Sequence, residues 1–121
     1  MKKITIITPT YNRAKTLPKV FESLLKQSFK DFIWIILDDG STDNTTEVVE
    51  NFQLFNPFFE IIYKKDKNRH KFLTVLEGVK MVKTPYFMVV DSDDIYPEDA
   101  LETLISEVEK IENQDNYVAV M

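Results

Sequence analysis

The sequence predicts an α/β protein in which a mainly parallel, Rossmann-like sheet lies between two layers of helices. Short apolar runs of strand length alternate with longer stretches whose apolar residues recur at helical spacing. A helix between each pair of successive strands is the pattern of parallel strands joined by crossovers. No linker or repeat interrupts it, so we expect residues 1–121 to form a single α/β/α domain.

The first elements have clear signals. Residues 4–8 are apolar or β-branched and predict the first strand, and residues 32–37 predict the second. Thr16 stands where an N-cap is expected, and Pro18 lies in the first helical turn, where a missing N–H is harmless. Between the two strands, apolar side chains recur at the spacing of one helical face, at Leu17, Val20, Phe21, Leu24 and Leu25.

The remaining elements follow by the same criteria. Residues 44–47 (NTTE) have the spacing of a capping box at a helix start, and Pro85 ends a later helix. Glu98 and Asp99 are acidic residues placed favourably at the start of the last helix. The expected ranges are a helix over 45–55, a strand over 59–63, a helix over 72–79, a strand over 86–90, a helix over 97–111 and a strand over 117–121.

The composition excludes several classes of function. The chain has no Cys, which excludes disulfides, thiol catalysis and zinc–thiolate sites. A net charge of -5 argues against nucleic-acid binding through a basic surface. No apolar run approaches the roughly 20 residues that span a bilayer. We therefore expect a cytoplasmic domain, with membrane association only through segments outside this sequence.

Polar clusters follow three of the expected strands without a gap, at residues 8–13 (TPTYNR), 38–43 (DDGSTD) and 91–94 (DSDD). Each cluster alone is also what an ordinary turn with helix caps contains. The carboxyl ends of parallel strands share one edge of the sheet, where open α/β sheets bind ligands. The convergence of all three clusters at one edge favours a binding site over three unrelated turns.

The last cluster has the composition of a metal site. Asp91, Asp93 and Asp94 place three carboxylates within four residues, and a cation between them would relieve their mutual repulsion. Hard divalent cations prefer such oxygen ligands. Asp91 and Asp93 are the candidate metal ligands, whereas Asp94 is either a further ligand or a turn residue that bonds the adjacent backbone.

The other two clusters have groups that suit a nucleotide-sugar. Asp39 can accept a hydrogen bond from a base N–H or a ribose hydroxyl, and Tyr11 offers an aromatic face to a base. A metal held by Asp91 and Asp93 would bridge a diphosphate and stabilise charge on a leaving group.

The three clusters, in this order and spacing, resemble the signatures of family 2 inverting glycosyltransferases, which have the GT-A fold. The resemblance covers essentially the whole chain and is to the N-terminal, nucleotide-sugar-binding part of such enzymes. It implies transfer of a sugar from a nucleotide-diphospho-sugar, most often a UDP-sugar, to a saccharide or lipid-linked acceptor hydroxyl, as in polysaccharide biosynthesis. It also implies a divalent cofactor, Mn2+ or Mg2+.

The resemblance assigns roles to individual residues. Asp91 and Asp93 would be the metal-binding D-x-D carboxylates, with Asp94 beside them. Lys71 is interpreted either as a donor-binding residue or as a solvated surface lysine. Because the general base of the family lies well beyond the D-x-D motif, we expect it beyond Met121 and expect this chain to be a fragment with the donor-binding half. The candidate donor-binding residues are Pro9, Thr10, Tyr11, Asn12, Arg13, Asp38, Asp39 and Lys71.

Two alternatives stay open at this point. The first is a non-catalytic nucleotide-binding or interaction module with the same fold. The second is a phosphatase of the haloacid dehalogenase type, with Asp91 as nucleophile and Asp93 as acid/base, although the lysine and later acidic pair of that family have no counterpart in the remaining chain. A calcium-binding EF-hand loop is rejected, because Tyr96 stands where its glycine is required.

Overall fold

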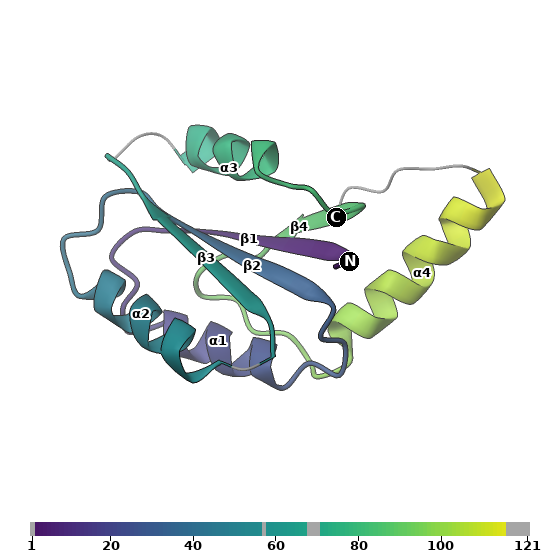
Figure 1. Cartoon of the computed structure of the whole chain (residues 1–121), viewed down its shortest axis with the longest axis horizontal. Coiled ribbons are helices and arrows are strands. Elements are labelled where there is room, and N and C mark those ends of the chain that lie inside the picture. The colour runs from purple at the N-terminus through teal and green to yellow at the C-terminus, as the bar shows by residue number, and fades with distance from the viewer. Residues whose placement is uncertain (1, 57, 68–70, 116–121) are drawn as a thin grey trace.

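The structure is a computed structural model and describes residues 2–56, 58–67 and 71–115. Within these residues, strands and helices alternate along the chain as predicted (Figure 1). The strand expected over 117–121 lies outside the described residues. The elements are β1 (Ile4–Thr10), α1 (Leu17–Leu25), β2 (Phe32–Asp38), α2 (Thr45–Phe55), β3 (Glu60–Lys65), α3 (Lys71–Lys80), β4 (Tyr86–Val89) and α4 (Ala100–Asp115).

The strands form one parallel sheet in the order β3-β2-β1-β4. All carboxyl ends therefore lie at the same edge, which confirms the α/β prediction. The register pairs Thr10 with Asp38, so β1 and β2 both extend into their polar clusters. The pairing of β1 with β4 ends earlier, at Ile7 and Val89. The sheet consequently opens between β1 and β4 at this edge.

This opening explains how a proline fits in a central strand. The carbonyls of Lys3, just before β1, and of Ile7 accept hydrogen bonds from the Tyr86 and Val90 N–H groups, at 3.2 and 2.9 Å, so both carbonyls face the β4 side. Backbone groups alternate sides along a strand, and those of Pro9 therefore face β4 as well. Since the ladder to β4 has ended at Val89, the missing N–H of Pro9 interrupts no hydrogen bond.

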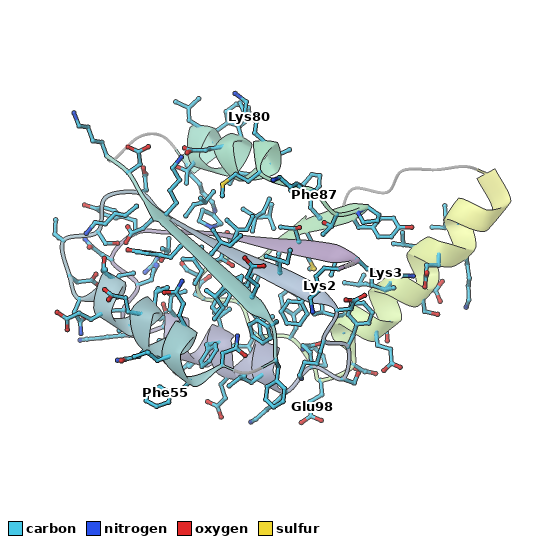
Figure 2. All side chains as sticks on the ribbon, in the orientation of Figure 1. Lys2, Lys3, Phe55, Lys80, Phe87 and Glu98 are labelled. Carbon is cyan, nitrogen blue, oxygen red and sulfur yellow. The ribbon has the colours of Figure 1, made fainter. Side chains whose placement is uncertain are left out.

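Helices cover both faces of the sheet, which confirms the predicted α/β/α layers. Figure 1 shows α1 and α2 on one face and α3 on the other. Alternate residues of β2 point to opposite faces of the sheet. Trp34 and Ile36 belong to the core on the face covered by α1 and α2, whereas Ile35 and Leu37 belong to the core on the face covered by α3. Side chains fill the space on both faces (Figure 2).

Trp34, in the middle of β2, is a core residue. Its ring is completely buried and stacks with Phe52 at a centroid distance of 5.9 Å. Its indole Nε1 donates a hydrogen bond of 2.8 Å to Thr8 Oγ1, so burial leaves the N–H satisfied. Helix α4 joins the same core through Leu101 and Ile105.

The helix caps differ from the sequence-based expectation. Thr16 and Asn44 occupy the N-cap positions of α1 and α2, but neither side chain makes a capping hydrogen bond. Asp43 caps α2 instead, because its Oδ1 accepts from the Thr45 backbone N–H at 3.1 Å. The N-cap position predicted at Asn44 is thus confirmed, but its side-chain hydrogen bond is not made and Asp43 supplies one in its place. The Thr16 hydroxyl bonds the Arg13 carbonyl at 3.4 Å.

Candidate functional site

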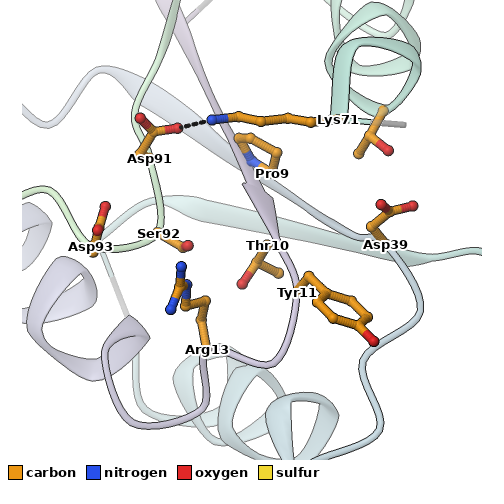
Figure 3. A pocket seen from close by; sticks show the side chains of 10 residues that line it. Pro9, Thr10, Tyr11, Arg13, Asp39, Lys71, Asp91, Ser92 and Asp93 are labelled. Atoms are coloured by element: carbon orange, nitrogen blue, oxygen red, sulfur yellow. Dashed lines mark hydrogen bonds and ion pairs between the residues drawn. The ribbon is translucent and has the colours of Figure 1, made fainter. Parts of the chain in front are cut away.

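A pocket of about 310 Å³ opens at the carboxyl ends of β1, β2 and β4. It brings together residues from all three polar clusters and from the first turn of α3 (Figure 3). Figure 3 shows Tyr11 and Asp39 at one side of the pocket and Asp91 and Asp93 at the other. The lining residues are Pro9, Thr10, Tyr11, Arg13, Asp39, Lys71, Thr74, Asp91, Ser92 and Asp93.

Lys71 reaches the carboxylate cluster directly. Its Nζ lies 2.9 Å from Asp91 Oδ1, although the two residues are distant in sequence (Figure 3). The side chains are 64% and 45% exposed, and ion pairs at that exposure contribute only about 0–1 kcal/mol. Asp91 can therefore exchange Lys71 for another cation with little loss of stability.

The carboxylates fit a metal ion whose coordination is completed by waters and substrate phosphates. They do not fit an ion enclosed by protein ligands alone. No group of three or more His, Cys, Asp or Glu side chains is arranged to hold a metal ion in the part of the chain that the structure describes. Asp91 and Asp93 nevertheless line one pocket. Mg²⁺ typically uses one or two carboxylates together with waters and substrate phosphates, which this donor set allows.

Asp94 has a different position from its two neighbours. Its backbone N–H donates to the Asp91 carbonyl at 3.1 Å and closes a turn. It is not among the residues that line the pocket. The Asp94 backbone thus takes part in a turn, and a role of its side chain as a further metal ligand stays a prediction.

The segment that carries these carboxylates is anchored to α1. Ser23 Oγ donates to the Tyr96 carbonyl and accepts from the Tyr96 N–H, both at 3.1 Å. The buried Gln27 side chain donates to the Pro97 carbonyl at 2.7 Å and accepts from the Leu101 N–H at 3.1 Å. Ser23 on α1 and Gln27, two residues after the end of that helix, thus hold residues 96–101, the segment that follows Asp91 and Asp93.

The two aspartates at the end of β2 lie in different surroundings, and their contact with a donor stays a prediction. Asp39 lines the pocket, whereas Asp38 is only 1% exposed and does not. Asp38 Oδ1 accepts from the Ser41 N–H at 2.8 Å, and Oδ2 accepts from the Tyr63 hydroxyl at 2.5 Å. The Tyr63 hydroxyl also lies 2.8 Å from Thr46 Oγ1. Asp38 therefore supports the loop after β2 from the interior.

Replacing Tyr63 with Phe should destabilise the protein and reduce its sensitivity to alkali. The change leaves Asp38 Oδ2 without this donor, which should lower the free energy of unfolding by about 1–3 kcal/mol. Burial, with the hydrogen bond to Asp38, raises the pKa of Tyr63 above its ordinary value of 10.0. The folded state thus holds this proton more tightly, and its contribution is complete below pH 10 and lost as the pH rises further.

Urea denaturation at neutral pH and above pH 10 measures both effects. Thr46→Val is the matched control, because it removes the other partner of Tyr63 and leaves Asp38 bonded. An unchanged free energy of unfolding for Tyr63→Phe would contradict a supporting role for this hydroxyl.

Asn12 also lies outside the pocket lining, although its neighbours Tyr11 and Arg13 belong to it. Its side-chain oxygen accepts hydrogen bonds from the Thr42 and Asp43 backbone N–H groups, at 2.7 and 3.3 Å. The structure thus places Asn12 as a link between two loops, beside the pocket and outside its lining.

Thr10, unlike Asn12, belongs to the pocket lining. It is 3% exposed and lines the pocket, and its Oγ1 is a buried side-chain oxygen with no hydrogen-bond partner. A buried hydroxyl without a partner costs about 1–3 kcal/mol, so a polar ligand group that reached it would relieve this cost.

Sequence reasoning missed two lining residues, Thr74 and Ser92. Thr74 lies three residues after Lys71 on α3, so helical spacing from Lys71 could have indicated it. Ser92 lies within the 91–94 cluster and was passed over in favour of the carboxylates. The supporting residues Ser41, Asp43 and Tyr63 act through long-range contacts that no local pattern reveals.

Comparison with known proteins decides the family. Residues 5–121 match the family model described as glycosyl transferase family 2. The chain belongs to glycosyltransferase family 2. The sequence-based resemblance is thereby confirmed, and the pocket at the carboxyl edge of this glycosyltransferase sheet is the candidate donor site.

The relatives of this family 2 chain are longer proteins. It is 33% identical over 107 residues to the glycosyltransferase GlyG of Streptococcus pneumoniae, a match that covers 88% of this chain and 35% of GlyG. It is 35% identical over 108 residues to the poly(ribitol-phosphate) beta-N-acetylglucosaminyltransferase TarP of Staphylococcus aureus, covering 86% and 32%. The chain thus spans about a third of the length of these relatives.

Solved structures confirm the GT-A fold. Residues 1–349 of S. aureus TarS in complex with UDP superpose with a TM-score of 0.81 at 26% identity, covering 89% of this chain and 32% of that one. A Pyrobaculum calidifontis mannosyltransferase, solved with GDP-Man and Mn2+, superposes with a TM-score of 0.80 at 20% identity, over 85% and 31%. Among the described residues of our chain, no helix has both the length and the apolar character needed to cross a membrane.

Proposed function

We propose that the pocket binds a nucleotide-diphospho-sugar of the UDP-sugar class, together with Mn2+ or Mg2+. In this proposal the protein transfers the sugar to an acceptor hydroxyl with inversion. The observation that carries it is the shape of the site, in which Tyr11 and Asp39 lie at one side and Asp91 and Asp93 at the other (Figure 3). Family membership and the UDP complex of TarS support the nucleotide.

The two sides of the pocket suit the two ends of such a donor. Tyr11 is 44% exposed and can stack on a base, while Asp39 can accept from a base N–H or a ribose hydroxyl. Asp91 and Asp93 would hold the metal, which supplies charge stabilisation for the leaving diphosphate when bound. Arg13 and Lys71 line the same pocket and provide positive charge for the phosphate oxygens.

The ion pair between Lys71 and Asp91 fits a site that changes partners on binding. If a metal were bound at Asp91, Lys71 would be available to the diphosphate, and the exposure of the ion pair means that losing it costs little stability. The buried hydroxyl of Thr10 would then have a ligand oxygen within the same pocket. The base that deprotonates the acceptor is assigned to none of these residues, because each has a role toward the donor.

Isothermal titration of the 121-residue chain with UDP, with and without Mn2+, tests the proposal. We expect a Kd of about 1 mM or tighter that improves at least about tenfold with Mn2+, and reversal by EDTA. Uridine without phosphate is the matched control and should show no Mn2+ dependence. A folded sample, verified by circular dichroism, that shows no heat of binding at millimolar UDP would contradict the proposed donor site.

A further inference from the structure

The loops after β1 and β2 carry the two groups at one side of the pocket, Tyr11 and Asp39. The loops are adjacent because β1 and β2 are neighbours in the sheet and Thr10 pairs with Asp38. The Asp39 N–H still donates to the Thr10 carbonyl, at 2.9 Å. Beyond that point the sheet ladder ends, and another device has to hold the loops together.

Asn12 supplies the first part of that device. Its backbone N–H donates to Ser41 Oγ at 2.8 Å. Its side-chain Oδ1 accepts from the Thr42 N–H at 2.7 Å and from the Asp43 N–H at 3.3 Å. One residue of the first loop therefore bonds three successive residues of the second.

Asp43 supplies the second part from the opposite loop. Its Oδ2 accepts from the Ala14 N–H at 3.2 Å, while its Oδ1 caps α2 at Thr45. Burial alone would raise the pKa of Asp43, but the hydrogen bonds from Thr45 and Ala14 together lower it below the ordinary value. The carboxylate form that accepts these hydrogen bonds is thus the favoured one.

The backbone of Asn12 shows how closely it is tied to this arrangement. Its φ is 52°, which makes it the single non-glycine residue with a positive φ among the residues that the structure describes. Asn tolerates this left-handed conformation better than most residues. In this conformation the backbone N–H and the side chain of Asn12 both form hydrogen bonds with the loop after β2.

We propose that Asn12 is a positioning residue that fixes Tyr11 relative to Asp39 and so sets the recognition of the nucleoside. This inference rests on the proposed function. Asn12 does not line the pocket, so it acts through its neighbours. An exposed aromatic ring on a loop gains binding energy when the loop is held in its binding conformation beforehand, because less order has to be created on binding.

A series at Asn12 separates its side chain from its backbone. Asn12→Gly keeps the positive φ and removes the acceptor, and should weaken UDP binding about tenfold. Asn12→Asp keeps both the acceptor and the tolerance of a positive φ, and should stay within about threefold of wild type. Ser41→Ala loosens the same contact from the other loop and should weaken binding in the same direction.

A double-mutant cycle with Tyr11→Ala tests whether Asn12 acts through that ring. If it does, Asn12→Gly adds much less to the loss once Tyr11 has been removed. Binding of Mn2+ with pyrophosphate, which needs only the opposite side of the pocket, should change by less than about twofold in Asn12→Gly. Hydrogen exchange should accelerate at the Thr42 and Asp43 amides in Asn12→Gly and not in Asn12→Asp.

The outcomes distinguish this inference from the proposed function. If wild type binds UDP and Asn12→Gly binds it equally well, the positioning role is wrong and the donor site stands. An equal loss for UDP and for Mn2+ with pyrophosphate would indicate a general structural defect and would also overturn it. If wild type does not bind UDP at all, the proposed function fails first.

Discussion

Asp91→Asn should lose the metal-dependent part of UDP binding, with a decrease in affinity in Mn2+ on the order of 10- to 100-fold. The substitution preserves the shape of the side chain and removes its charge, so the cation loses one of the two pocket carboxylates proposed to hold it. The loss of the exposed ion pair with Lys71 should change the free energy of unfolding by less than about 1 kcal/mol. Titration with UDP in Mn2+ and in EDTA measures the difference directly.

Asp94→Asn is the matched control, because it makes the same change three residues away, at a side chain outside the pocket lining. It should keep the Mn2+ dependence of UDP binding. Retention of that dependence by Asp91→Asn, or an equal loss in both variants, would contradict the assignment of the metal to Asp91.

Gly78→Ala should destabilise the protein by about 1–3 kcal/mol, although the same change on an exposed helix stabilises by up to about 1 kcal/mol. A Cβ on Gly78 would lie 2.7 Å from Leu37 Cδ1 and 2.8 Å from Ile7 Cγ2. Both residues are buried at the face of the sheet under α3, and the β-branched Ile7 has little freedom to move. The added methyl group should push α3 outward, and Lys71 and Thr74 with it.

Urea denaturation measures the stability of Gly78→Ala, and titration with UDP measures the displacement of the pocket residues on α3. In a Leu37→Ala background the nearest clash is removed, so Gly78→Ala should cost much less there than in wild type. A rise in stability in the wild-type background, as at an exposed helix position, would show that α3 does not approach the sheet this closely.

The alternation of strands and helices and the three polar clusters could be predicted because each depends on neighbouring residues. The spacing of Leu17, Val20 and Leu24 specifies a helical face wherever that helix packs. Likewise, a parallel sheet necessarily brings its carboxyl ends to one edge. Those rules predict that Tyr11, Asp39 and Asp91 lie close together, and in the structure all three line one pocket.

The roles of adjacent residues could not be predicted in the same way. Asp38 and Asp39 are identical in type, and so are Asp93 and Asp94, yet only one of each pair lines the pocket. Successive residues point in different directions, and which direction meets the pocket depends on the elements packed nearby. Asp38 bonds Tyr63 of β3 in the interior of the protein. Asp94 lies in the turn after Asp91, outside the pocket lining.

The sequence by itself determined the α/β class, the edge of the sheet where the pocket lies and the residue types gathered there, since all three follow from periodicity and local chemistry. The tertiary structure alone decided which polar residues face the pocket and which hold it together. Asn12 shows the difference: its partners Thr42 and Asp43 lie about 30 residues away in sequence. Contacts of that kind exist only once β1 and β2 pair side by side, and no local pattern records them.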